Sequence, residues 1–229
     1  MAPPPLPPDA PPAAAGAPAR PALALSRRAA LGAALCLGAP RVALADAVDD
    51  ALRDVTKARE KLRSLACPFT QERVLGLLAT KVTSRGDLTL VRPDRLRWHL
   101  EPPDEATYWV TPEGVAYRSR EGGGKAGNAG PWGAMLGDLL VALGGDLARL
   151  RARYAIAAER PADGLTLTLT PKAPEAAKLL RSLRLTLAPD LLSPSRLVLE
   201  EPGDDRATIV FGPAKLNAPV DPSRLKPPA

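Results

Sequence analysis

Short runs in which apolar and polar residues alternate recur along the chain after residue 85, and they constrain its fold more than any other feature. In residues 96–100, Leu and Trp alternate with Arg and His, and residues 108–117 alternate around a Pro-Glu-Gly turn at 112–114. A period of two is typical of strands with one buried face, and such turns favour hairpins. Because the connections are short, we expect an antiparallel sheet rather than alternating βαβ units. Further runs of this kind span residues 88–90, 154–158, 165–169, 183–187, 197–199 and 208–211.

Apolar residues at helical spacing predict helices before and between the strands. The first helix is expected from about Ala47 to Leu65 and should end at Cys67-Pro68, since proline disfavours a continuing helix. A second helix is expected over residues 132–143, and residues 146–153 add another turn or two. Residues 121–130 are rich in glycine and are predicted to form a loop. The positions that follow helical spacing in the first segment are Val48, Leu52, Val55, Arg59, Leu62 and Leu65.

About ten antiparallel strands and two or three amphipathic helices predict an α+β fold. A sheet of that length must curl, and with one Leu/Val face it curls around its apolar side, which the helices can cover. The pattern leaves two alternatives open: the interior is either a tightly filled core or a hydrophobic pocket with a helical lid. Aromatic residues make up only 3% of the chain, so either one must be built from Leu, Val and Ala.

Residues 1–45 are predicted to be a disordered Pro/Ala-rich leader followed by an export signal. Paired arginines at 27–28, an apolar stretch at 29–39 and Ala43-Leu44-Ala45 follow the order of a signal peptide, with the cut expected before Asp46. The paired arginines resemble a twin-arginine signal, but Ala30 stands where that pattern prefers Phe, so Sec export stays open. Residues 46–229 are then one domain with 27 basic and 24 acidic residues, a net charge of +3.

The chain is short of the side chains that most enzymes and metal sites need. Its single histidine, His99, and its two cysteines argue against His-based metal or triad chemistry and a four-thiolate zinc site. The G-x-G-x-x-G pattern at 122–127 stands among antiparallel signals rather than in a βαβ unit, and the S-x-x-K pattern at 223–226 has no companion motifs. The interleaved charges give no footprint for nucleic acid. We therefore expect no enzyme, no cofactor, no metal and no nucleic-acid partner.

A series of short motifs carries a family resemblance. In chain order they are Phe69-Thr70-Gln71, Gly86-Asp87-Leu88, Arg92-Pro93, Arg97-Trp98, Pro102, the segment Val110 to Tyr117 around Gly114, and Leu169-Thr170-Pro171-Lys172. Each is short, but their joint order after an export signal resembles LolA, the periplasmic carrier of outer-membrane lipoproteins. The resemblance runs from about residue 47 to 219. The family's fold, an incomplete antiparallel β-barrel closed by a helical lid, agrees with the architecture expected from the pattern.

The resemblance implies carriage rather than catalysis. Such a protein shields lipoprotein acyl chains in a hydrophobic cavity and moves them through the periplasm from the inner to the outer membrane. The implied partners are acylated lipoproteins, an ATP-driven ABC exporter of the inner membrane and, in some bacteria, an outer-membrane receptor lipoprotein; we expect a monomer. The alternatives are a periplasmic sensor of mislocalised lipoproteins or a lipid or glycolipid carrier on the same fold, and, more remotely, an exported hydrolase.

The resemblance also implies roles for single residues. Arg92 matches the arginine that bonds the lid backbone and holds the empty cavity shut, although an Arg-Pro pair can merely end a strand. Leu96 stands where the family often has a cavity-facing Phe, and Trp98 matches a common Trp; both could equally be core residues. Phe69 and Gln71 match the family's Phe-x-Gln and are expected to pack and pair in the first strand. The whole predicted cavity lining is Leu88, Leu90, Leu96, Trp98, Tyr108, Val110, Met135, Leu136, Leu139 and Leu140.

Two features depart from the family. Its cavities are commonly rich in aromatic residues, whereas this one would be lined mostly by Leu, with Leu136, Leu139 and Leu140 as the inner surface of the lid. The short tail at 220–229 is also expected to lack part of the family's C-terminal extension, which discourages the return of cargo to the inner membrane.

Overall fold

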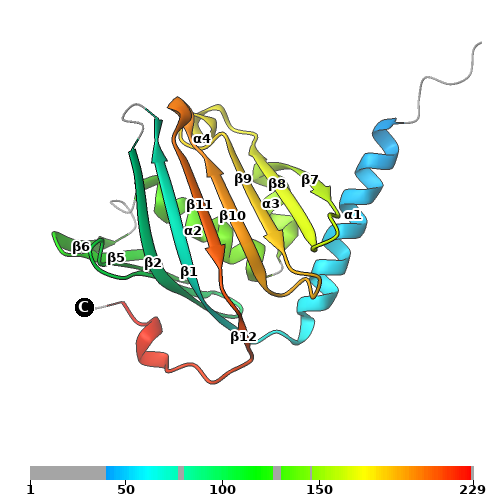
Figure 1. Ribbon diagram of the computed structural model, residues 1–229. Helices are drawn as coiled ribbons and strands as arrows, with labels where there is room; N and C mark the ends of the chain where they lie inside the picture. Colours follow the sequence, from blue (N-terminus) through cyan, green and yellow to red (C-terminus); the bar gives the residue numbers. More distant parts are fainter. Residues whose placement is uncertain (1–39, 77–79, 126–129, 145, 228–229) are drawn as a thin grey trace, which may run out of the picture. The chain divides into compact units, whose positions relative to one another are not determined.

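In the described residues twelve strands form one antiparallel sheet, which the alternation and the short connections predicted (Figure 1). The computed structural model describes residues 40–76, 80–125, 130–144 and 146–227. The strand order is β6-β5-β4-β3-β2-β1-β11-β10-β9-β8-β7, and β12 pairs with β1 off this path. Within the described residues β6 and β7 are the two free ends, so the sheet is open, as an incomplete barrel requires. The strands are β1 (Ser64–Leu75), β2 (Thr80–Val91), β3 (Arg95–Leu100), β4 (Ala106–Thr111), β5 (Gly114–Ser119), β6 (Gly122–Lys125), β7 (Tyr154–Glu159), β8 (Leu165–Pro171), β9 (Ser182–Leu187), β10 (Pro194–Glu200), β11 (Arg206–Phe211) and β12 (Lys215–Leu216).

Helices α2 (Gly130–Gly144) and α3 (Leu147–Arg153) pack on one face of the sheet (Figure 1). Helix α2 contacts β3, β4, β5 and α3, and helix α1 (Pro40–Ala58) contacts β7. None of the described helices is long and apolar enough to cross a membrane. The remaining helical segments are α4 (Pro174–Ala177) and the 3₁₀ turns η1 (Arg59–Lys61), η4 (Pro202–Asp204) and η5 (Pro222–Leu225).

The core lies between α2 and the inner face of the sheet and consists mainly of leucine. Leu136 and Leu139 of α2 are fully buried in this core. Three of the few aromatic residues cluster in it: the rings of Phe69 and Trp98 are 4.1 Å apart, and Phe211 meets both edge-on at 6.2 Å. Cys67 is buried in the same core, and burial raises the pKa of its thiol to about 12.

The predicted end of the first helix is wrong. Helix α1 ends at Ala58, a 3₁₀ turn follows, and Cys67-Pro68 lies inside β1. From Leu65 to Gln71 every second side chain is buried, as in a strand. Leu65 fits both the helical spacing and this strand pattern. Pro68 is tolerated because it stands where the partner of β1 changes from β12 to β11, an interruption at which a missing N–H removes no ladder bond.

The prediction of a loop over residues 121–130, the glycine-rich segment, is wrong in part. Residues 122–125 form β6 and pair with β5. A Cβ on Gly124 would lie 3.2 Å from a ring carbon of Tyr117, so the missing side chains let this strand lie against the tyrosine. Gly127, the last glycine of the G-x-G-x-x-G pattern, is outside the described residues.

Most of the predicted leader and signal also lies outside the described residues. Helix α1 begins at Pro40 and therefore spans both sides of the predicted cut before Asp46. The export signal and the domain boundary at residue 46 stay predictions.

Candidate functional site

Two cavities lie at one end of the sheet's inner face, and Arg73 of β1 lines both of them. We call the larger, of about 460 Å³, the α2 cavity, and the smaller, of about 290 Å³, the β2–β4 cavity. The α2 cavity is lined by Arg73, Met135, Asp138, Arg153, Tyr154, Pro171, Ala176, Lys178, Leu179, Leu180, Leu199, Glu201 and Pro202. The β2–β4 cavity is lined by Gln71, Arg73, Leu75, Val82, Ser84, Trp98, Leu100, Asp104 and Tyr108.

A polar group stands between the two cavities. The Nη2 of Arg73 lies 3.2 Å from a carboxylate oxygen of Glu201, which lines the α2 cavity. The charge of Arg73 also reaches the other side: burial raises the pKa of Tyr108 in the β2–β4 cavity, and Arg73 partly opposes this rise. An ion pair between Arg73 of β1 and Glu201, the residue after β10, therefore stands between the two largely apolar spaces.

Three of the ten predicted cavity residues line these spaces. Trp98 and Tyr108 line the β2–β4 cavity, and Met135 lines the α2 cavity. The other seven pack in the core and line neither of the two cavities; as the lining of an opened interior they stay a prediction. They are Leu88, Leu90, Leu96, Val110, Leu136, Leu139 and Leu140.

Arg92 donates hydrogen bonds to η1 and to the residue that follows it, rather than to α2. Its Nη1 donates to the carbonyl of Arg59 and, at 3.2 Å, to that of Leu62. These contacts join the end of β2 to η1. The role of Arg92 as a gate stays a prediction.

Arg59 is the side chain that reaches α2 from this end. It is fully buried, and its Nη1 donates to the carbonyl of Ala142, one of the last carbonyls of α2 that have no partner within the helix. Burial, and next the charge of Arg92, lower the pKa of Arg59 to about 10. Arg92 and Arg59 thus link β2, η1 and α2 in sequence. The sequence signal for Arg59 was its place in the apolar stripe of the first helix, where a charged residue is unexpected.

Asp138 holds α2 at a second point. This carboxylate is 3% exposed, and it accepts hydrogen bonds from the hydroxyl of Tyr154 and from Arg153. Burial raises the pKa of Asp138, while those two partners oppose the rise. Sequence reasoning missed this residue; the available signal was a single carboxylate between Met135 and Leu139 on an apolar helix.

Replacing Asp138 by Asn is expected to change how stability depends on pH. The unfolded carboxyl titrates near ~3.9, and burial raises the pKa in the folded state. The folded state therefore binds more protons, and this group's contribution to stability falls as pH rises from about 4 through the raised pKa. The unfolding free energy of D138N minus that of the parent should therefore increase over that interval and then level off. Urea unfolding at a series of pH values measures it, and parallel curves for the two proteins would contradict the assignment.

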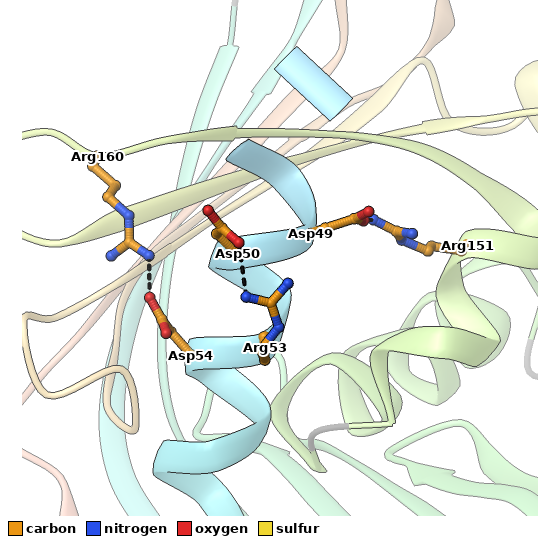
Figure 2. Close-up of polar contacts among 6 residues, drawn as sticks. All are labelled: Asp49, Asp50, Arg53, Asp54, Arg151 and Arg160. Carbon is orange, nitrogen blue, oxygen red and sulfur yellow. Dashed lines mark hydrogen bonds and ion pairs between the residues drawn. The ribbon is translucent and has the colours of Figure 1, made fainter. Parts of the chain in front are cut away.

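Helix α1 is attached to the rest of the fold by its apolar side and by exposed ion pairs. Figure 2 shows Asp49 paired with Arg151 of α3 and Asp54 paired at 2.6 Å with Arg160, which follows β7. Exposed pairs of this kind contribute roughly 0.2–1 kcal/mol each. The buried Ala51, Leu52 and Val55 on the other side of the helix therefore supply most of its attachment.

The site holds no arrangement that points to a metal. Among the described residues no group of three or more His, Cys, Asp or Glu side chains is placed to hold an ion.

Comparison with known proteins gives one family and several loosely similar folds. The family described as outer membrane lipoprotein carrier protein LolA matches residues 60–120. No curated protein matches the sequence. A LolA superfamily protein from Nitrosomonas europaea is 11% identical, with a TM-score of 0.43 over 78% of this chain and 97% of that one. A DUF1329 family protein from Desulfovibrio piger is 10% identical, with a TM-score of 0.45 over 78% and 97%. The MucA/MucB complex of Pseudomonas aeruginosa gives 15% identity and a TM-score of 0.42 over 80% of this chain and 61% of that one.

The matched segment contains much of the site. It spans η1 to β5 and includes Gln71, Arg73, Arg92 and Trp98. It is also the part in which the short motifs are densest, so the resemblance predicted from their order is confirmed. Over this segment the chain is similar to the LolA family of outer membrane lipoprotein carriers.

Proposed function

We propose that the protein is a periplasmic carrier that shields lipoprotein acyl chains inside its open sheet and moves them from the inner to the outer membrane. The observation that supports this most is the pair of cavities at one end of a leucine-lined interior, in a chain of the LolA type. In this proposal α2 is the lid of the cavity. The partners of the protein are acylated lipoproteins, an inner-membrane ABC exporter and an outer-membrane receptor.

The energetics of acyl chains explain why such a carrier needs an enclosed interior. At ~0.8 kcal/mol per CH₂, a chain of about 16 carbons costs on the order of 12 kcal/mol to expose to water. The carrier must offset most of this cost and still release the chain. A leucine surface with few aromatic residues suits that task, because it binds through area rather than through specific contacts. Leucines of α2 now occupy the interior, so chains enter only as α2 moves outward. That movement breaks the bond from Arg59 to α2 and the bonds from Arg153 and Tyr154 to Asp138 of α2.

The α2 cavity is the place at which this entry would start. It reaches from the buried Leu199 and Met135 to Leu179, a large apolar side chain that is 53% exposed. An apolar path from solvent to core lets a chain advance without exposing all of its methylenes at once.

Replacing Met135 by Trp, which fills the α2 cavity, is expected to weaken binding of a fluorescent hydrophobic probe such as 1-aminoanthracene by about tenfold, that is ~1.4 kcal/mol. Val210→Trp is the matched control, because Val210 is an exposed residue of β11; its affinity should equal that of the parent. Equal binding by M135W and the parent would remove the α2 cavity from the proposal.

Native mass spectrometry of protein purified from its own periplasm tests the cargo. Acylated protein or lipid should co-purify, and a preparation that remains free of acyl chains and takes up no probe would contradict the proposal. Depletion of the protein separates carriage from sensing. Carriage predicts that outer-membrane lipoproteins accumulate in the inner membrane, and unchanged sorting on depletion would contradict it.

A further inference from the structure

Two buried polar groups in the β2–β4 cavity lack hydrogen-bond partners among the described residues. They are the Oε1 of Gln71, a residue 7% exposed, and the Nε1–H of Trp98, a residue 1% exposed. Both side chains line this cavity. Buried polar groups are nearly always hydrogen-bonded, and an unpaired one is unfavourable. Two in one small cavity indicate a partner that binds there.

Two other polar side chains of this cavity have partners among the described residues. Ser84 donates to the carboxylate of Asp104, and Arg73 pairs with Glu201. A ligand there meets one unpaired buried acceptor, Oε1 of Gln71, and one unpaired buried donor, Nε1–H of Trp98. Tyr108 also lines the cavity. The apolar wall beside them consists of Leu75, Val82 and Leu100.

This combination distinguishes the chemical linkages by which acyl chains are attached. An amide linkage presents a carbonyl that accepts and an N–H that donates, whereas an ester presents only acceptors. An amide can therefore satisfy both Trp98 and Gln71, but an ester leaves the oxygen of Gln71 unpaired.

We infer that the β2–β4 cavity binds an amide-linked acyl chain, that is, the chain of an N-acylated amine. Trp98 Nε1–H donates to the amide carbonyl, Gln71 Oε1 accepts from the amide N–H, and the chain lies along the apolar wall. The inference rests on the proposed function, since it puts an acyl chain in the same interior. It adds a preference for the linkage that neither the fold nor the leucine lining implies.

A matched pair of uncharged ligands tests the preference. N-(2-hydroxyethyl)hexadecanamide and 2-hydroxyethyl hexadecanoate differ only in an N–H in place of an ester oxygen. Each displaces 1-aminoanthracene from the purified protein, and the apparent dissociation constants are compared. We expect the amide to bind about fivefold more tightly, the size expected from one neutral hydrogen bond.

Two substitutions separate the two hydrogen bonds. Gln71→Leu should abolish the preference for the amide and leave the affinity for the ester within about twofold of the parent value, since the ester does not use this acceptor. Trp98→Phe should weaken amide and ester alike and leave their ratio unchanged, because both contain the carbonyl. Thr70→Val is the control: Thr70 is the exposed neighbour of Gln71 on the other face of β1, and both affinities should stay at the parent values.

The outcomes are distinguishable. Equal binding of amide and ester by the parent protein, or an unchanged preference in Q71L, overturns the inference and leaves acyl-chain binding intact. Retained affinity of Q71L for the ester shows that this variant is folded. If neither ligand displaces the probe, the proposed function fails as well.

Discussion

Replacing Gly86 by alanine is expected to lower the free energy of unfolding by about 3 kcal/mol or more. A Cβ at this position would clash with the carbonyl oxygen of His99 and would lie 2.7 Å from the ring of Phe69. Neither neighbour can move easily, because His99 belongs to the paired strand β3 and the Phe69 ring is stacked 4.1 Å from that of Trp98. The strands β1, β2 and β3 would have to separate to admit one methyl group. Urea unfolding followed by circular dichroism measures the loss.

Gly137→Ala is the matched control for this prediction. Gly137 lies within α2, and a Cβ there would meet nothing within 4 Å. Alanine is the better helix former, so this variant should be more stable than the parent by about 0.5–1 kcal/mol. If G86A stays within about 1 kcal/mol of the parent, the close approach of β3 and Phe69 to this glycine is not as the structure describes it.

Replacing Arg92 by leucine is expected to slow the transfer of acylated cargo by about tenfold, the effect of ~1.4 kcal/mol on one step, and to leave the protein folded. Nη1 of Arg92 donates hydrogen bonds to the carbonyls of Arg59 and Leu62. Arg59 in turn donates to the carbonyl of Ala142 near the end of α2. Removing Arg92 takes away that support and also the like charge that lowers the pKa of Arg59. The closed position of α2 changes in either case, toward a loose lid or toward one that opens less readily.

The measurement is the rate at which a labelled acylated cargo passes from the protein to outer-membrane vesicles, with circular dichroism as the check on folding. Arg92→Lys keeps the charge but replaces the planar fork by a single ammonium group, so it should fall between R92L and the parent. Arg95→Leu, three residues on at the start of β3, is the control and should transfer at the parent rate. Parent-like transfer by R92L would remove Arg92 from the gate.

Alternation was sufficient to predict the strands from β7 to β11, the strands from β2 to β5 and the hairpin of β4 and β5. Each of them buries one face, so every second residue must be apolar, and this local requirement is visible without any partner strand. The boundary between α1 and β1 was not visible in the same way. Leu62 and Leu65 fit a helical spacing, while Leu65 and Cys67 also fit a strand, and the pairing with β2, β11 and β12 decides between them.

The sequence by itself determined the open antiparallel sheet, the apolar α2 and the motifs of the LolA-type segment, because these depend on spacing along the chain. Only the tertiary structure decided which residues form the site. The burial of Arg59 against α2, the pairing of Asp138 on α2 with Arg153 and Tyr154, the place of Arg73 between the two cavities, and the unpaired atoms of Gln71 and Trp98 all depend on tertiary contacts. Their side chains come together from distant strands and helices. The same packing decided that most of the predicted lining is core in this form, since leucines of α2 fill the space that spacing alone left open as a pocket.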